Sequence, residues 1–339
     1  MSQACIRCRK QKRKCDKLFP VCSLCKRLSK SCSYPVIDAE SPRPISVPDL
    51  SDLTPLNIRY TLEEQVSSIV GDGPQLQEAV AVYFRTVHAW LPVVAETAFY
   101  SRLWKFRTQP APSEFSVLTL CMFLVCTMPI DGAVSAETRS LYILVKGFIA
   151  TLEAMGTNSL DLLQARLLLT VFEIGHAIYP AAYISAGANV RAAIALGASA
   201  ASSEDLHKVF LDPQEAEEAR RTWRGIIITD RYTSLESDNE PSALRGRRVD
   251  AAINNHDVDE TMQSDPFTKL FHSSGLLEHV LAHIHEYHEL ISLPPPKSVE
   301  ARLDALHIIK TLTSLLATFQ RESPTLDPLS SSSLAIYRR

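Results

Sequence analysis

Hydrophobic residues recur at helical spacing through most of the chain after about residue 58. The stretch 141–155 is the clearest case, because its apolar residues follow a period of about 3.6 and a glycine follows them: Leu141, Leu144, Val145, Phe148, Ile149, Leu152 and Met155. The same pattern predicts further helices, at about 61–70, 74–87, 113–128 and 160–178, and helix pairs to about residue 320. No segment reads as a β-hairpin and there are only 11 glycines, so the body is predicted to be all-α.

Several polar residues and glycines predict where these helices begin and end. Thr61 and Glu64 are spaced as a capping box, and Gly71 follows the apolar run. Pro74 stands where a first helical turn should begin, since proline is tolerated there. Ser113 is the predicted cap of the most apolar helix, which is too short to span a bilayer.

The first 34 residues do not follow the helical pattern and differ sharply in charge. They hold ten Lys or Arg and one acid, a formal charge of +9, whereas the rest of the chain carries −12. Overall, 46% of the residues are hydrophobic and 22% are charged, which excludes wholesale disorder. The asymmetry indicates a small module for a polyanion joined to an acidic globular body.

Six of the eight cysteines lie in this basic segment, as a duplicated C-x2-C-x6-C unit with an offset of 17 residues: Cys5, Cys8, Cys15, Cys22, Cys25 and Cys32. Zinc prefers four tetrahedral ligands, and thiolates suit it well. Six thiolates could serve one zinc with two left over, or two zincs if two thiolates bridge. The twofold repeat favours two Zn²⁺ per chain, because both halves then contribute equally.

The segment has few apolar residues, so metal binding must supply its folding free energy, on the order of 10 kcal/mol per structural zinc. A three-disulfide knot is the alternative. It is disfavoured because basic residues are threaded between the cysteines and no secretion signal precedes them.

Each half is expected to form a short helix after its C-x2-C pair. The N-terminal end of the first helix would approach the major groove of DNA. This helix would carry most of the cations: Arg9, Lys10, Lys12, Arg13 and Lys14. The second would carry Lys26, Arg27 and Lys30. A simple nuclear-localisation run is the alternative for the first set, although localisation alone would not need the cysteines.

The cysteine spacing, the block from Cys8 to Asp16, and Pro20 two places before Cys22 resemble the fungal binuclear zinc cluster transcription factors. The resemblance implies that Cys5 and Cys22 bridge the zincs, with Cys8 and Cys15 completing one ligand set and Cys25 and Cys32 the other. It implies that Lys12 reads a CGG-type triplet in double-stranded DNA, that Pro20 shapes the loop between the halves, and that the protein is nuclear. The implied phosphate contacts are Arg9, Lys10, Arg13, Lys14 and Lys17.

The body resembles the fungal-specific middle homology region of the same family over roughly 75–320. The resemblance rests on stretches in this order: 163–169, 186–197, 217–223, 230–231 and 240–241. From the residues alone, these stretches are expected to pack and not to perform chemistry. In particular, Arg220, Arg221, Trp223 and Asp230 are predicted to hold helices together.

The predicted organisation therefore has four parts: a zinc cluster DNA-binding domain at 1–34, a Pro-rich linker at 35–57, an all-helical regulatory domain at 58–322 and a Ser-rich flexible tail at 323–339. Leu50, Leu53 and Leu56 are too few, and lie among too many prolines, to make a coiled coil. The regulatory domain is the candidate for homodimerisation, for contacts with the transcription machinery and for binding a small-molecule effector.

The predicted function is a nuclear, zinc-dependent, sequence-specific transcription factor of RNA polymerase II genes that regulates a metabolic or secondary-metabolite gene cluster. Since the chain ends at Arg339, the alternative is a truncated competitor without an activation segment; another is an effector-binding scaffold with a secondary zinc module. No enzyme motif is present and no membrane partner is expected. Cys121 and Cys126 are assigned to the core. The four histidines of 276–291 are assigned to helix packing: His279, His283, His285 and His288.

Overall fold

The structure is a computed structural model, and it describes residues 4–18, 21–33, 54–71, 73–106, 108–129, 134–200, 203–236, 241–244, 265–268, 270–272 and 274–275. The chain divides into two compact units, Met1–Thr54 and Pro55–Arg339. The predicted histidine cluster of 276–291 and the Ser-rich tail lie outside the described residues.

The first unit contains two short helices, α1 (Ile6–Lys10) and α2 (Ser23–Arg27). Its buried residues are sulfur-bearing, since Cys5, Cys8, Cys22 and Cys25 are at most 2% exposed and form their own cluster. Apolar side chains such as Leu18 and Leu28 are instead exposed. A segment without a hydrocarbon core of this kind depends on its cysteines for a defined fold.

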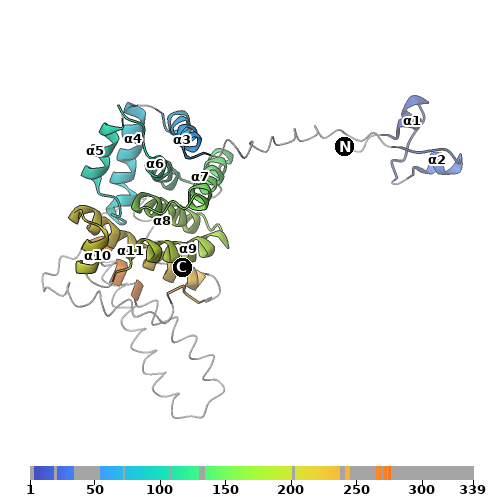
Figure 1. The fold of residues 1–339 in the computed structure, drawn as a ribbon. Helices are drawn as coiled ribbons and strands as arrows, with labels where there is room; N and C mark the ends of the chain where they lie inside the picture. Colours follow the sequence, from blue (N-terminus) through green and yellow to red (C-terminus); the bar gives the residue numbers. More distant parts are fainter. Residues whose placement is uncertain are drawn as a thin grey trace, which may run out of the picture. The chain divides into compact units, whose positions relative to one another are not determined.

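The second unit is built from helices (Figure 1), and the described residues contain no strand. These are α3 (Pro55–Ile69), α4 (Pro74–Arg85), the 3₁₀ helix η2 (Val87–Ala89), α5 (Glu96–Lys105), α6 (Ser113–Val125), α7 (Ala136–Ala154), α8 (Leu160–Gly175), α9 (Ala181–Leu196), α10 (Ser203–Val209) and α11 (Pro213–Glu236). The prediction of an all-α protein is confirmed.

The second unit is organised around two apolar helices, α6 and α8, which pack against each other. Helices α3, α4 and α7 contact α6, while α9 and α11 contact both α8 and each other (Figure 1). Every side chain from Phe115 to Met122 is buried, as are most of those from Leu160 to Phe172. Helices that are buried on all sides carry apolar residues all round and not a single stripe.

Several predicted helix ends agree with the structure, but two predicted caps, Thr61 and Ser113, do not. Pro74 begins α4, and Gly71 and Gly156 take positive φ values of 94° and 81° just beyond α3 and α7. Helix α3 starts at Pro55, so Thr61 lies inside it and donates its hydroxyl to the Asn57 carbonyl at 2.9 Å. The capping box was wrong because a hydroxyl inside a helix bonds equally well to the preceding turn.

Ser113 is the first residue of α6 and not its cap, because Pro112 holds the cap position. Helix α6 ends at Val125 and α8 at Gly175, each three residues before the predicted end. Such differences are common, because hydrophobic periodicity marks the buried face of a helix more precisely than its last turn.

Polar side chains at the helix interfaces connect the elements of the second unit. Gln164 on α8 donates to the Val93 carbonyl at 2.7 Å and to the Glu218 carboxylate on α11 at 3.0 Å. Arg166 on α8 donates to Asn189 on α9 at 3.3 Å. Buried polar groups of this kind are stable only when they are paired.

Of the four residues on α11 that were predicted to hold helices together, Trp223 and Asp230 contact residues outside α11. Trp223 is buried in the core, and the Asp230 carboxylate accepts hydrogen bonds from the Ala243 and Leu244 backbone amides at 3.2 and 3.3 Å. Arg220 and Arg221 both pair with Glu217, which lies on the same helix. No helix among the described residues is long and apolar enough to cross a membrane.

Candidate metal centre and nucleic-acid interface

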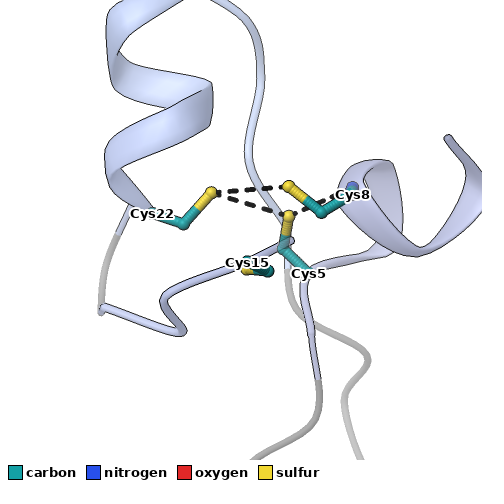
Figure 2. Close-up of side chains that lie close together, drawn as sticks. All are labelled: Cys5, Cys8, Cys15 and Cys22. Carbon is teal, nitrogen blue, oxygen red and sulfur yellow. Dashed lines mark hydrogen bonds between the residues drawn. The ribbon is translucent and has the colours of Figure 1, made fainter. Parts of the chain in front are cut away.

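The six cysteines of the first unit form two groups of four that share two members. The first group is Cys5, Cys8, Cys15 and Cys22, and the second is Cys5, Cys22, Cys25 and Cys32. Within each group the sulfur atoms lie within 4.8 Å of one another, and Figure 2 shows the first group converging on one point. The Sγ atoms of the shared pair, Cys5 and Cys22, are 3.8 Å apart.

The two short helices place the shared cysteines. Cys5 is the N-cap of α1 and accepts a hydrogen bond from the Cys8 amide, while Cys22 is the N-cap of α2 and accepts one from the Cys25 amide, both at 3.4 Å. These backbone hydrogen bonds lower the pKa of Cys5 and of Cys22. The two cysteines common to both groups thus each accept a helix amide hydrogen bond that favours the thiolate.

This donor set fits two zinc ions. Two tetrads of thiol sulfur with a common edge offer four ligands to each of two cations, and sulfur tetrads are typical of structural zinc. Cys5, Cys8, Cys22 and Cys25 are almost fully enclosed, as expected for a closed structural site. All six cysteines are free thiols, so the geometry does not match a disulfide knot.

The cations of the first half are exposed, but the helix lies differently from the prediction. Helix α1 begins directly after its cap, Cys5, and ends at Lys10, so Lys12, Arg13 and Lys14 follow its C-terminal end. The expectation that they lie on a helix after Cys8 was wrong, because the helix already starts between the two cysteines, where the Cys8 amide donates to the Cys5 sulfur. Lys12 takes a left-handed conformation with φ 50° in the turn that leaves the helix.

The backbone of this turn repeats in the second half. The Arg13 amide donates to the Cys8 carbonyl at 2.9 Å, and 17 residues later the Lys30 amide donates to the Cys25 carbonyl at 3.0 Å. Ser29 has a φ of 49°, almost that of Lys12. The two halves thus have the same backbone conformation in this turn, but the first has a lysine at the left-handed position where the second has a serine.

Asp16 is a structural residue of this unit to which the sequence analysis gave no role. Its carboxylate accepts hydrogen bonds from the Ser23 amide at 3.1 and 3.2 Å and from the Leu18 amide at 3.4 Å. The hydrogen bonds from Ser23, and then from Leu18, lower the pKa of Asp16. The 17-residue repeat could have pointed to it, because Asp16 and Ser33 occupy equivalent positions after the third cysteine of each half.

The second unit has an open cavity of about 470 Å³, lined by Glu63, Val66, Ser67, Gly71, Gly73, Leu76, Gln77, Leu103, Phe106, Ala111, Phe115, Ser116 and Thr119. It is mostly apolar, and the Glu63 carboxylate accepts a hydrogen bond from the Ala111 amide at 3.0 Å.

Cys121 is buried, and burial raises the pKa of Cys126 to about 11, so neither is a reactive thiolate.

Comparison with known families assigns both units. Residues 3–41 match the fungal Zn(2)-Cys(6) binuclear cluster domain, and residues 80–323 match the fungal specific transcription factor domain. The first domain binds two zinc ions, which confirms the predicted cofactor. Both descriptions belong to transcription factors and neither to an enzyme, as the sequence predicted.

Two curated relatives are also similar to parts of the chain. Transcription factor BOA15 of Botryotinia fuckeliana (strain B05.10) is 38% identical over 124 residues, which cover 36% of this chain and 66% of that protein. The uncharacterized transcriptional regulatory protein YLL054C of Saccharomyces cerevisiae (strain ATCC 204508 / S288c) is 42% identical over 62 residues, covering 17% of this chain and 7% of that protein. The chain thus spans less than two thirds of either relative, and no solved structure matches it.

Proposed function

Since this chain belongs to the family of fungal specific transcription factors, we propose that it is a nuclear regulator that binds specific DNA sequences through its first unit. The observation that carries the proposal is the pair of cysteine tetrads beside a turn of exposed cations. The tetrads supply a rigid metal-dependent scaffold, and the cations supply contacts to a polyanion.

Six cysteines are proposed to hold the two zinc ions: Cys5 and Cys22 as shared ligands, Cys8 and Cys15 for one ion, and Cys25 and Cys32 for the other. The convergence of the two tetrads on Cys5 and Cys22 supports this assignment. Bound zinc would join α1 to α2 through these cysteines and would supply the folding free energy that the short unit cannot gain from hydrocarbon burial.

Lys12 is the proposed reader of a CGG-type triplet. It is exposed and lies in a turn at the end of α1, so its ammonium group can approach guanine O6 and N7 in the major groove. Arg9, Lys10, Arg13, Lys14 and Lys17 are proposed to contact phosphates, because all five are exposed in the same half.

A binding-site selection with the full-length protein tests the assignment. The selection should return CGG-type triplets, and Lys12→Ala should cost about 1–3 kcal/mol of discrimination at one base pair. Arg13→Ala should weaken binding to all sequences alike and reduce the slope of log affinity against log salt by about 0.9.

The matched control is Ser29→Ala, which changes the residue in the equivalent turn of the second half and should leave the preference unchanged. A Lys12→Ala protein that selects the same triplets as the wild-type protein would refute the role of Lys12.

The second unit is proposed to regulate transcription through homodimerisation, contacts with the transcription machinery or an effector. The match to the fungal specific transcription factor domain supports such a role. Tethering residues 55–339 to a heterologous DNA-binding domain at a reporter gene separates the alternatives: an activator raises expression, and a competitor without activating function does not. Light scattering of the full-length protein, with and without a duplex of two triplets, tests dimerisation.

The cavity beside α3 is the proposed effector site. Its volume is in the range of small-molecule sites, and its apolar walls with a few polar groups suit a small, largely apolar ligand. Thr119→Trp would fill the cavity from its wall. A ligand that raises the melting temperature of the wild-type protein but not of this variant would support the site, whereas equal shifts would exclude it.

The proposed targets are genes of a metabolic or secondary-metabolite cluster, as the family resemblance implies. Mapping of chromosomal binding sites tests this directly. Binding sites scattered among unrelated genes would contradict the proposal while leaving the DNA-binding assignment intact. The alternative of an effector-binding scaffold requires that the first unit bind zinc without preferring any duplex sequence.

A further inference from the structure

The 17-residue repeat extends from the cysteines to hydrogen bonds that join the two halves of the first unit. The Ile6 amide, at the start of α1, donates to the Ser33 carbonyl of the second half at 2.8 Å. The Ser23 amide, at the start of α2, donates to the Asp16 carboxylate of the first half at 3.1 and 3.2 Å. Ile6 and Ser23 are equivalent in the repeat, and so are Asp16 and Ser33. Each half therefore holds the first helical residue of the other half.

We call each of these hydrogen-bonded contacts between the halves a joint, the Ser33 joint and the Asp16 joint. The two joints use different acceptors. At Ser33 the acceptor is a main-chain carbonyl, which every residue type provides. At Asp16 it is a side-chain carboxylate, which also accepts from the Leu18 amide at 3.4 Å. The Oδ1 atom of Asp16 accepts from both the Leu18 and the Ser23 amide, and Oδ2 accepts a second time from Ser23, so this joint depends on the side chain of one residue.

The position of the Asp16 joint connects it to both the metal centre and Lys17, one of the proposed phosphate contacts. Asp16 follows Cys15 directly, and the Ser23 amide follows Cys22 directly, so the joint fixes two members of one tetrad relative to each other. On its other side Asp16 precedes Lys17, which has a positive φ of 61°. Loss of the joint frees the loop between the halves at both ends.

We propose that Asp16 is a positioning residue: its carboxylate fixes the second half against the first, which slows zinc loss and holds the cationic turn in the orientation that reads DNA. This inference rests on the proposed zinc and DNA binding of the same unit. Asp16 is the single acid among the ten cations of residues 1–34, and the proposal gives its carboxylate a role in geometry and not in the net charge of the unit.

The electrostatic alternative predicts the opposite sign for DNA binding. An exposed carboxylate beside phosphate-contacting lysines repels DNA, so its removal would raise the affinity for every duplex and leave the metal centre unchanged. Loss of a geometric joint would instead speed zinc loss and lower the affinity for the specific duplex relative to a shuffled one.

The experiment uses the full-length zinc-loaded protein and its Asp16→Ala and Asp16→Asn variants. We would measure the rate of zinc transfer to an excess of a coloured chelator and the affinities for a selected duplex and a shuffled duplex. Asp16→Ala should release zinc about tenfold faster and show a smaller specific-to-shuffled affinity ratio, because charge-assisted hydrogen bonds are lost. Asp16→Asn removes the same charge but keeps one amide-accepting oxygen, so it should fall between Asp16→Ala and the wild-type protein.

The matched control is Asp205→Ala on α10. Asp205 is an exposed acid of the second unit that pairs with Lys208, so its loss changes the charge of the chain equally. It should leave both the zinc release rate and the affinity ratio unchanged.

Wild-type rates of zinc release in both Asp16 variants, with higher affinity for both duplexes, would overturn the proposal and establish a charge effect. If Asp16→Ala fails to retain two zincs while Asp16→Asn retains them, the positioning role is supported. A wild-type protein without zinc or without duplex preference would refute the proposed function itself, which distinguishes the two failures.

Discussion

Gly225 lies where α11 packs against α8 and the segment before α5, and its substitution tests how tight this packing is. A Cβ atom at this position would lie 2.7 Å from Leu167 Cδ2, 3.3 Å from Leu91 Cδ1 and 3.5 Å from Val93 Cγ1. Leu167, Leu91 and Val93 are at most 1% exposed, so they have little room to move. Gly225→Ala therefore overpacks the core, at a cost of about 1–3 kcal/mol.

This cost is partly offset by helix propensity, since alanine is about 1 kcal/mol better than glycine inside a helix. Gly225→Ala should thus destabilise the second unit by about 0–2 kcal/mol. Gly147 on α7 is the matched control, because it is exposed and a Cβ there meets no atom within 4 Å. Gly147→Ala should stabilise the unit by about 0.5–1 kcal/mol.

Urea unfolding followed by tryptophan fluorescence is the assay. All three tryptophans, Trp90, Trp104 and Trp223, lie in the second unit, so the signal does not report on the zinc-binding unit. In a Leu167→Ala background the space is already open, and Gly225→Ala should then lose most of its cost, with a coupling of about 1 kcal/mol or more. If Gly225→Ala stabilised the protein as much as Gly147→Ala, the close packing of α11 on α8 would be refuted.

Three further predictions concern buried acids and the metal. Burial raises the pKa of Glu218, so its contribution to stability is present at low pH and is lost as the pH rises through its folded-state pKa; Glu218→Gln should therefore gain stability relative to the wild-type protein with rising pH in urea titrations. Asp230→Ala strands the amides of Ala243 and Leu244 and should cost about 2–4 kcal/mol in the same assay. Chelation of zinc should unfold the first unit, seen as loss of amide protection at α1 and α2, while tryptophan fluorescence stays unchanged.

The metal centre could be predicted from the sequence because its information is local. Metal ligands must be cysteines at short, fixed spacings, and the repeat of C-x2-C-x6-C leaves few ways to arrange four sulfurs around each ion. The position of α1 could not be predicted in the same way. Cys5 caps the helix with its sulfur, and a thiolate is not among the usual cap residues, so the expected start fell after Cys8.

The helices of the second unit were predictable where one face is apolar, as in α7, but their partners were not. Helices α6 and α8 are buried all round, so their sequences contain no stripe that indicates which helix lies on which side. The bonds of Gln164 to Val93 and Glu218 join positions 71 and 54 residues away. Such pairings depend on tertiary packing, which a single sequence does not encode in any periodic signal.

The first unit shows how a duplicated backbone acquires an asymmetric function. Metal geometry requires that the two halves agree, and they do so in their cysteines, their helix caps and the left-handed residue after each helix. Recognition of DNA depends on side chains, which are free to differ because they lie outside the sulfur core. Where Lys12 stands in one half, Ser29 stands in the other, so only the first half carries a cation at this left-handed position. The same freedom explains why one joint between the halves uses a backbone carbonyl and the other the Asp16 carboxylate.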